Sequence, residues 1–204
     1  IPALLLRGEG FVKTVKFRAP TYLGDPVNTV HLFNDKEADE LMVLDIDATR
    51  EGRPPRFGLI ARLAEECFMP LGCGGGITQL EEMRRLFGVG IEKVVLNTAA
   101  HRHPELVERA ATAFGSQSVV VALDVKRGWF GGYEVRVEGG RRGTDKSPED
   151  QALLMERAGA GELLVTSIDR DGTQSGYDVE LMRRVVDAVR IPVVACGGAR
   201  GSED

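Results

Sequence analysis

Short runs of apolar residues recur along the chain and alternate with segments of helical pattern. Most runs are continuously apolar rather than alternating, which is typical of parallel strands buried on both faces. The predicted strands are Ala3–Leu6, Leu41–Asp45, Pro70–Cys73, Lys93–Leu96, Ser118–Leu123, Leu163–Ser167 and Pro192–Cys196. Strands that alternate with helices in this way predict an α/β fold with a parallel sheet.

Helices are predicted between these strands, because residues that begin and end helices stand there. Asp25-Pro26, His103-Pro104 and Ser147-Pro148 each place a proline where a first helical turn would begin. Thr78 and Glu81 have the spacing of a capping box. Glycines follow the expected helix ends at Gly88, Gly90, Gly115, Gly159 and Gly161.

Residues 40–82 and 162–204 repeat one pattern with an offset of 122 positions. Each copy reads as strand, loop, helix, strand and glycine-rich turn; PLGCGGG from Pro70 is repeated as PVVACGG from Pro192. A period this long indicates two matching half-domains rather than a solenoid of short repeats. We therefore predict one (βα)8 TIM barrel domain over residues 1–204, with half-barrels at about 1–115 and 116–204.

The same offset predicts a strand beyond the end of this sequence. The fourth predicted strand begins at Lys93, so its counterpart would begin near position 215, past Asp204. A barrel sheet without that strand would expose two edges. We therefore expect the C-terminal eighth βα unit to be missing from this chain and the second half-barrel to be incomplete.

Composition narrows the functional classes. Hydrophobic residues make up 43% and charged residues 28% of the 204 positions, which is ordinary for a globular protein. The net charge of −5 argues against nucleic-acid binding by bulk electrostatics. Neither a membrane span nor a signal peptide is apparent, and three cysteines do not form a disulfide framework. We expect a cytoplasmic protein without nucleic-acid or membrane partners.

No motif for a metal or a cofactor is present, because neither CxxC nor HExxH occurs. The histidines His31, His101 and His103 lack the context of a metal site. His101 and His103 flank a predicted helix start, and we expect both to be solvated. The sequence therefore predicts neither a metal nor a cofactor.

Glycine-rich turns follow two strands that occupy matching places in the repeat. Gly74-Gly75-Gly76 and Gly197-Gly198 would let the backbone and a helix start approach an anion closely. Asn97-Thr98-Ala99, after the fourth strand, could complete the first site. The alternative for each turn is a tight connection without a ligand, but the matching positions favour two phosphate sites.

Carboxylates also gather at the predicted carboxyl ends of strands, where barrels of this type hold their active sites. The aspartates there are Asp45, Asp47, Asp124, Asp169 and Asp171. Asp124 directly follows an apolar run, and burial would raise its pKa toward neutrality and suit it to act as a general acid or base. Asp169 stands in what looks like a structured loop and could equally cap that loop.

The first strands of the two halves differ at one position. With Ala3–Arg7 aligned on Ala122–Lys126, the counterpart of Asp124 is Leu5. A leucine cannot transfer a proton, so a reaction that needs an acid and a base on opposite faces would lose one of them. Three charged residues, Glu40, Lys93 and Glu162, each precede a strand; from their positions alone they read as surface ion pairs.

Two connections have features of mobile loops. Residues 127–146 are rich in glycine and arginine and predict a small hairpin with a loop, and Arg7–Phe17 also reads as a mobile loop with Gly8 and Gly10.

Several longer motifs together resemble the cyclase subunit of imidazole glycerol phosphate synthase. They are GDPV (24–27), DELMVLDI (39–46), GGGI (74–77), KVVLNTAA (93–100), FGSQSVVVALD (114–124) and TSIDRDGTQSGYD (166–178). The resemblance implies a (βα)8 barrel that docks a glutaminase, a glutamine amidotransferase subunit, as a heterodimer. Ammonia from glutamine would pass through the barrel to a bis-phosphorylated ribulosyl formimino carboxamide nucleotide (PRFAR). The products would be imidazole glycerol phosphate, for histidine biosynthesis, and aminoimidazole carboxamide ribotide.

The resemblance also implies roles for individual residues. Asp124 matches one of the family's two catalytic aspartates. Glu40, Lys93 and Glu162 match three of the four residues that gate ammonia entry. Substrate-binding or phosphate-binding positions are matched by Lys13, Gly75, Gly76, Thr98, Asp171, Gly197 and Gly198.

This chain departs from the family at Leu5, where the family carries its other catalytic aspartate. One interpretation is a cyclase with altered acid/base chemistry. Another is the paralogue type found with surface-polysaccharide genes, which would pass ammonia to a sugar-modifying amidotransferase. A third is a catalytically silent barrel that only activates its glutaminase. The related single-chain isomerase of the same pathway needs no ammonia, so the match at Glu40, Lys93 and Glu162 disfavours it.

Overall fold

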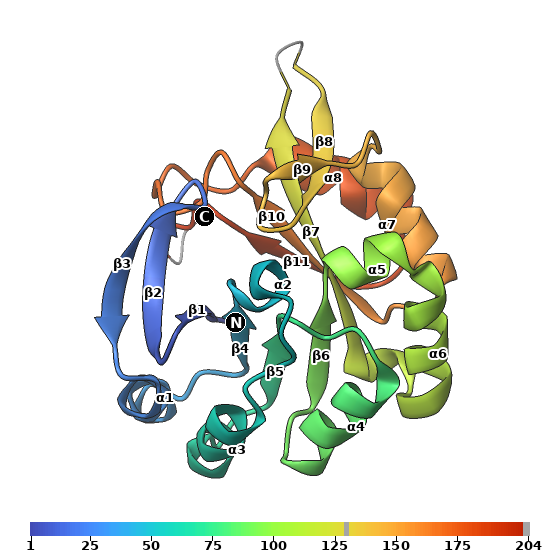
Figure 1. Ribbon diagram of the computed structural model, residues 1–204. Coiled ribbons are helices and arrows are strands. Elements are labelled where there is room, and N and C mark those ends of the chain that lie inside the picture. Colours follow the sequence, from blue (N-terminus) through green and yellow to red (C-terminus); the bar gives the residue numbers. More distant parts are fainter. Residues whose placement is uncertain (129–130, 202–204) are drawn as a thin grey trace. The chain divides into compact units, whose positions relative to one another are not determined.

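The computed structural model describes residues 1–128 and 131–201 (Figure 1). Its contacts cluster in two compact units. Unit 1 consists of Ile1–Lys13 and Thr21–Leu96, and unit 2 consists of Thr14–Pro20 and Asn97–Asp204. These limits differ from the predicted division at residues 115 and 116, so the single domain and its two predicted halves stay predictions.

Unit 1 contains four parallel strands and the helices between them. The parallel strands are β1 (Ala3–Arg7), β4 (Leu41–Asp45), β5 (Leu71–Gly74) and β6 (Lys93–Leu96), and they pair in the order β6-β5-β4-β1. The helices are α1 (Pro26–Asp35), α2 (Ala48–Glu51), α3 (Phe57–Glu66) and α4 (Leu80–Gly88).

Two further strands, β2 (Gly10–Val15) and β3 (Arg18–Gly24), follow β1 in the sheet, and β2 runs antiparallel to β1 (blue in Figure 1). The turn between β2 and β3 belongs to unit 2.

Unit 2 is built on three parallel strands, β7 (Val119–Arg127), β10 (Glu162–Ser167) and β11 (Val193–Cys196), in the order β11-β10-β7. β8 (Tyr133–Val137) pairs antiparallel with β7, and β9 (Arg142–Gly143) pairs with β8. The helical segments are α5 (Thr98–Arg102), α6 (Pro104–Phe114), the 3-10 turn η1 (Ser116–Ser118), α7 (Pro148–Arg157) and α8 (Val179–Ala188).

All seven predicted strands are confirmed, as β1, β4, β5, β6, β7, β10 and β11. Parallel strands alternate with helices in each unit, which confirms the α/β class and the βα pattern of a partial TIM barrel. The continuously apolar runs are buried as expected: the side chains from Val119 to Leu123 are at most 6% exposed.

The repeat is visible in the element limits and in the packing of its glycines. α3 and α8 span matching residues at the offset of 122, as do β5 and β11. A Cβ on Gly75 would lie 2.3 Å from the carbonyl oxygen of Asp45, and a Cβ on Gly197 would lie 2.6 Å from that of Ser167. Both glycines have positive φ, +104° and +86°. The glycine turns therefore recur because the same close backbone approach recurs.

The predicted helix starts are confirmed, except that the capping box of α4 lies one residue later than expected. The Asp25 carboxylate accepts a hydrogen bond from the Asn28 amide at 3.1 Å, as expected of a capping residue. The capping-box prediction at Glu81 was wrong by one residue. α4 begins at Leu80, so the carboxylate in the third helical position is that of Glu82, which accepts from the Gln79 amide at 3.0 Å.

Two other sequence expectations need correction or completion. The segment Arg7–Phe17 is not a simple loop, because most of its residues lie in β1 and β2. The hairpin expected in residues 127–146 is present as β7 and β8, while residues 129–130 of that segment lie outside the described residues. His101 was expected to be solvated, but both ring nitrogens are buried, and burial lowers the pKa of this imidazole to about 4.

The packing of Gly75 makes a stability prediction. Gly75→Ala should destabilise the protein by roughly 2–4 kcal/mol, because the new methyl group meets backbone and φ is positive. Gly88→Ala is the matched control, since its Cβ would meet nothing within 4 Å. Urea unfolding of both variants measures the difference. Equal stability of the two would contradict the close approach.

Candidate active site

Strand register in unit 2 brings three polar side chains into line. Thr166 on β10 pairs with Asp124 on β7 on one side and with Cys196 on β11 on the other. Paired residues of parallel strands present their side chains to the same face of the sheet. We call Asp124, Thr166 and Cys196 the Asp124 row; it lies near the carboxyl ends of its strands.

Asp124 has the electrostatic character of an acid/base group. Its carboxylate accepts a hydrogen bond from the Asn97 side-chain amide at 2.9 Å. Burial raises the pKa of Asp124 to about 7, the Asn97 hydrogen bond opposes that rise, and the negative charge of Asp171 adds to it. A carboxyl group that is about half ionised at neutral pH can both donate and accept a proton.

Cys196 and Thr166 are members of the site that were not singled out in the sequence. Burial raises the pKa of the Cys196 thiol, a hydrogen bond with Thr166 lowers it, and the carboxylates of Asp171 and Asp124 raise it further. The signal that could have found both residues is the repeat, because Thr166 and Cys196 stand at the positions of Leu44 and Gly74 in the first copy.

The corresponding row of unit 1 carries no polar side chain. Leu5 on β1 pairs with Leu44 on β4, and Leu44 pairs with Gly74 on β5. We call these three residues the Leu5 row. The register therefore supports the alignment of Leu5 with Asp124. Leu44 and Gly74, the next residues in the Leu5 row, are the repeat counterparts of Thr166 and Cys196 in the Asp124 row.

Asp171 is engaged with the turn of the first hairpin. Its carboxylate accepts hydrogen bonds from the Thr14 hydroxyl at 2.8 Å and from the Phe17 amide at 3.3 Å. A Cβ on Gly172, where φ is +68°, would lie 2.1 Å from the Thr14 carbonyl oxygen. The Asp171 loop and residues 14–17 are thus tightly packed, and Asp171 lies near enough to Asp124 to influence its pKa.

The aspartates at the end of β4 have structural partners. Asp45 is 7% exposed and receives two hydrogen bonds from the Arg53 guanidinium, at 2.8 and 2.9 Å. The hydrogen bond to Asp45 is the main cause that raises the pKa of the Arg53 guanidinium. Asp47 pairs with Arg50 at 2.8 Å and with Arg7 at 3.2 Å. Neither carboxylate resembles the lightly paired group that acid/base catalysis needs.

The aspartates beyond β10 also differ from Asp124. Asp169 accepts a hydrogen bond from the Arg127 amide at 2.8 Å, which favours the loop-capping interpretation. Asp178 is 8% exposed and accepts a hydrogen bond from the Tyr133 hydroxyl at 2.8 Å. Burial, followed by the hydrogen bond and charge of Asp178, raises the pKa of Tyr133 to about 12. This buried pair ties β8 to the start of α8.

The glycine-rich turns follow their strands as expected. Close backbone packing alone explains why glycines stand there. Gly76 would bring a Cβ within 2.4 Å of the Arg53 carbonyl oxygen, and Gly198 would bring one within 2.2 Å of the Gly176 carbonyl oxygen. Thr98, in unit 2, is buried, and its hydroxyl accepts from the Glu138 amide at 3.0 Å. Phosphate binding by these residues stays a prediction.

Two of the three predicted ammonia-gate residues form an ion pair. The Lys93 ammonium donates to the Glu40 carboxylate at 2.9 Å, and both side chains are largely buried. The pair lies at the amino ends of β4 and β6. Glu162 occupies the amino end of β10 in unit 2. Lys13 is exposed on β2.

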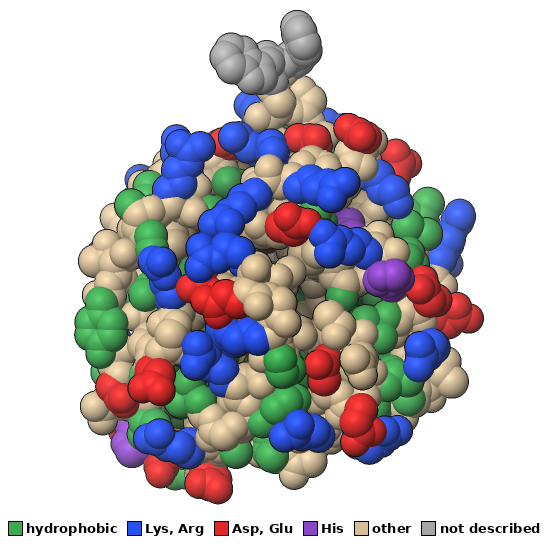
Figure 2. Space-filling view, in the orientation of Figure 1, with side chains coloured by type: hydrophobic (Ala, Val, Ile, Leu, Met, Phe, Trp, Pro, Cys, Tyr) green, Lys and Arg blue, Asp and Glu red, His purple; other side chains and the backbone are tan. Residues whose placement is uncertain are grey.

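Basic side chains gather in the part of Figure 2 where Figure 1 draws β8 and β9. Arg141, Arg142 and Lys146 of this region are exposed. Among residues 1–128 and 131–201 no three acidic, histidine or cysteine side chains are grouped to hold a metal ion. Within the same residues, every helix is too short or too polar to span a bilayer.

Comparison with known proteins gives consistent matches over the whole chain. Residues 1–204 match the family model described as "Histidine biosynthesis protein". The chain is 50% identical to a Pseudomonas aeruginosa protein provisionally named imidazole glycerol phosphate synthase subunit hisF2, with all of this chain and 81% of that protein covered. Imidazole glycerol phosphate synthase subunit HisF of Alkaliphilus metalliredigens is 46% identical, with the same two coverages. A Leptospira interrogans protein, provisionally named subunit HisF, is also 46% identical, again over 100% of this chain and 81% of its own length.

The surroundings of Asp124 predict how its titration responds to substitution. A carbon-13 NMR titration should place the pKa of Asp124 near 7. Asn97→Ala should raise this pKa, because it removes a hydrogen bond to the charged form, and Asp171→Asn should lower it, because it removes a nearby negative charge. Asp169→Asn is the control, with no expected change. A midpoint near 4 in the unsubstituted protein would contradict the buried site.

Proposed function

Because the chain belongs to the histidine biosynthesis protein family, we propose that it is the ammonia-receiving barrel subunit of an imidazole glycerol phosphate synthase-type complex. In this proposal ammonia comes from a glutaminase subunit and the substrate is a bis-phosphorylated nucleotide such as PRFAR. Asp124 is the one remaining carboxylate of the acid/base pair. The observation that carries the proposal is the contrast between the Asp124 row and the Leu5 row.

The geometry around Asp124 supports one proton transfer. Asn97 fixes the carboxylate with a hydrogen bond, and a pKa near 7 leaves both protonation states populated at neutral pH. Conversion of PRFAR with ammonia needs protons to be moved at more than one atom. The Leu5 row offers no group that exchanges protons, so one of these transfers would depend on water or on the substrate itself. The proposed consequence is slow cyclisation.

An exposed aromatic side chain near the Lys93–Glu40 pair supports docking of a glutaminase at this end of unit 1. Phe68, in the loop before β5, lies at the same edge, because β4, β5 and β6 run parallel. Its side chain is 86% exposed. The Asn34 side chain holds this loop: it donates to the Glu66 carbonyl oxygen at 2.7 Å and accepts from the Phe68 amide at 3.1 Å. A fixed, exposed aromatic side chain suits a protein interface.

A second candidate function is ammonia transfer to a different acceptor, such as the sugar of a surface-polysaccharide precursor. The Leu5 row favours it, because a barrel that only conducts ammonia does not need a pair of proton-transfer groups. A silent activator of the glutaminase would share the docking surface but would show no dependence on Asp124. The isomerase alternative would need neither the partner nor ammonia.

Restoring a carboxylate should restore cyclisation. Leu5→Asp should raise ammonia-dependent turnover of PRFAR by about ten- to a hundredfold, because a positioned acid or base contributes on the order of 10²–10⁴ to a proton transfer. Leu5→Asn is the matched control: it is polar and similar in size but cannot exchange a proton at neutral pH. An equal gain in both variants, or no gain in either, would contradict the role given to Leu5.

Docking should depend on Phe68. Phe68→Ala should weaken binding of the cognate glutaminase by at least about tenfold, since a central aromatic contact contributes about 2 kcal/mol or more. Val186→Ala, at an exposed apolar position on α8, is the control and should leave binding unchanged. Isothermal titration calorimetry of the two proteins measures both. Unchanged affinity of the Phe68 variant would remove this loop from the interface.

A further inference from the structure

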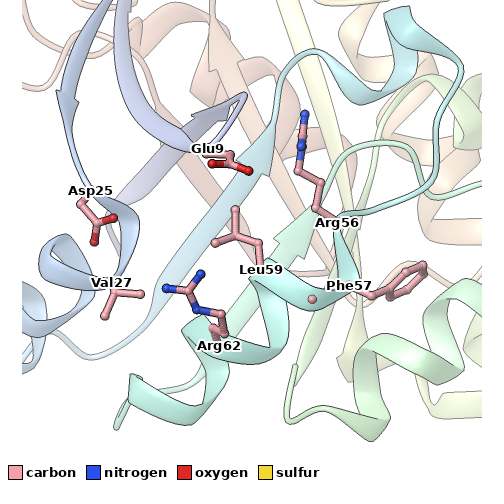
Figure 3. Close-up of a pocket in the computed structure, with 8 residues that line it drawn as sticks. Glu9, Asp25, Val27, Arg56, Phe57, Leu59 and Arg62 are labelled. Atoms are coloured by element: carbon pink, nitrogen blue, oxygen red, sulfur yellow. The ribbon is translucent and has the colours of Figure 1, made fainter.

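Unit 1 contains a pocket that the proposed cyclase chemistry does not use. Its volume is about 350 Å³. Three segments line it: Glu9 from the β1–β2 turn, the start of α1, and α3 from its N-cap to its middle (Figure 3). The lining residues are Glu9, Asp25, Val27, Arg56, Phe57, Gly58, Leu59 and Arg62. Both acidic and basic side chains therefore border the same small space.

Two oppositely charged side chains at this pocket have no partner in the described part of the chain. Within residues 1–128 and 131–201, neither the Glu9 side chain nor the Arg62 side chain makes a hydrogen bond or an ion pair, and both are exposed. In Figure 3 their charged groups come from different elements, and the Leu59 side chain lies between them in the view. An arginine and a glutamate that border one pocket without pairing leave both charges available to a ligand.

The repeat shows that this arginine has a different use in unit 2. The counterpart of Arg62 is Arg184 on α8. Arg184 pairs with Glu149 and lies 5.3 Å from the centre of the Tyr133 ring, so it is occupied in packing. Arg62, at the same place on α3, has neither contact. The pocket is therefore a property of unit 1 rather than a general consequence of the fold.

The start of α3 adds positive potential to the same pocket. Arg56 precedes the helix, and no side chain caps its first amides. Asp25 adds negative charge on the side of α1, where one of its carboxylate oxygens accepts from the Asn28 amide. Val27 and Leu59 contribute apolar surface between these groups. The pocket thus combines an anion-binding side, a cation-binding side and an apolar floor.

We propose that this pocket binds a small zwitterion, namely an α-amino acid with an apolar side chain. The ligand carboxylate pairs with Arg62 on α3, and the ligand ammonium pairs with Glu9 and Asp25. The ligand side chain covers Leu59 and Val27. This proposal is independent of the reaction at Asp124, because every lining residue belongs to unit 1 and Asp124 belongs to unit 2.

Calorimetric titration of the full-length protein with L-leucine tests the proposal. Leucinamide lacks the carboxylate and N-acetyl-L-leucine lacks the ammonium, so each should bind at least about tenfold more weakly than leucine, because each loses a charged hydrogen bond. Glu9→Gln and Arg62→Gln should each weaken leucine binding by a similar factor. Arg183→Gln, an exposed arginine on α8, is the control and should leave binding unchanged.

The same titrations contain the results that would overturn the proposal. N-acetyl-L-leucine binding as tightly as leucine would make the pocket a simple anion site. If leucine bound both pocket variants as tightly as the parent protein, its binding site would lie elsewhere. No heat of binding with leucine would remove the site. Because Glu9 and Arg62 are exposed and unpaired, both variants should unfold at the same temperature as the parent protein, which separates lost binding from lost fold.

Discussion

Parallel pairing in fixed register is the constraint on which the rest of this structure depends. It sets which side chains share a face at the carboxyl end of each strand, and in unit 2 it aligns Asp124 with Thr166 and Cys196. The same register in unit 1 aligns Leu5 with Leu44 and Gly74. The two units therefore repeat a scaffold, while the chemistry at equivalent positions has diverged.

The parts that are repeated are those that packing demands. Gly75 and Gly197 approach the ends of neighbouring strands so closely that any side chain would meet a carbonyl oxygen. The parts that differ are side chains, or the contacts of side chains, at matching positions of the two copies. Leu5 stands where the second copy has Asp124. Arg62 and Arg184 are both arginines, but only Arg184 pairs with Glu149 and packs on Tyr133. A duplicated fold can thus carry separate functions at matching positions.

Sequence patterns predicted the strands and most helix starts, because burial on both faces and helix capping leave local signals. They did not predict the β2–β3 hairpin. The residues of β3 are almost all exposed and follow no apolar pattern, although β2 is largely buried. The sequence patterns singled out Asp124 but did not show why Asp45 should differ from it. Both follow apolar runs, and only the structure shows that Arg53 occupies the first and that Asn97 and Asp171 tune the second. His101 is buried by tertiary contacts, which also leave no signal in the local sequence.

We propose a barrel subunit that receives ammonia but keeps only one carboxylate of an acid/base pair. The most direct test is the steady-state rate at which the unsubstituted full-length protein converts PRFAR in the presence of ammonium. We expect a rate at least about a hundredfold below that of a relative with both aspartates, measured side by side, because one acid/base group is missing. An equal rate in the two proteins would contradict it.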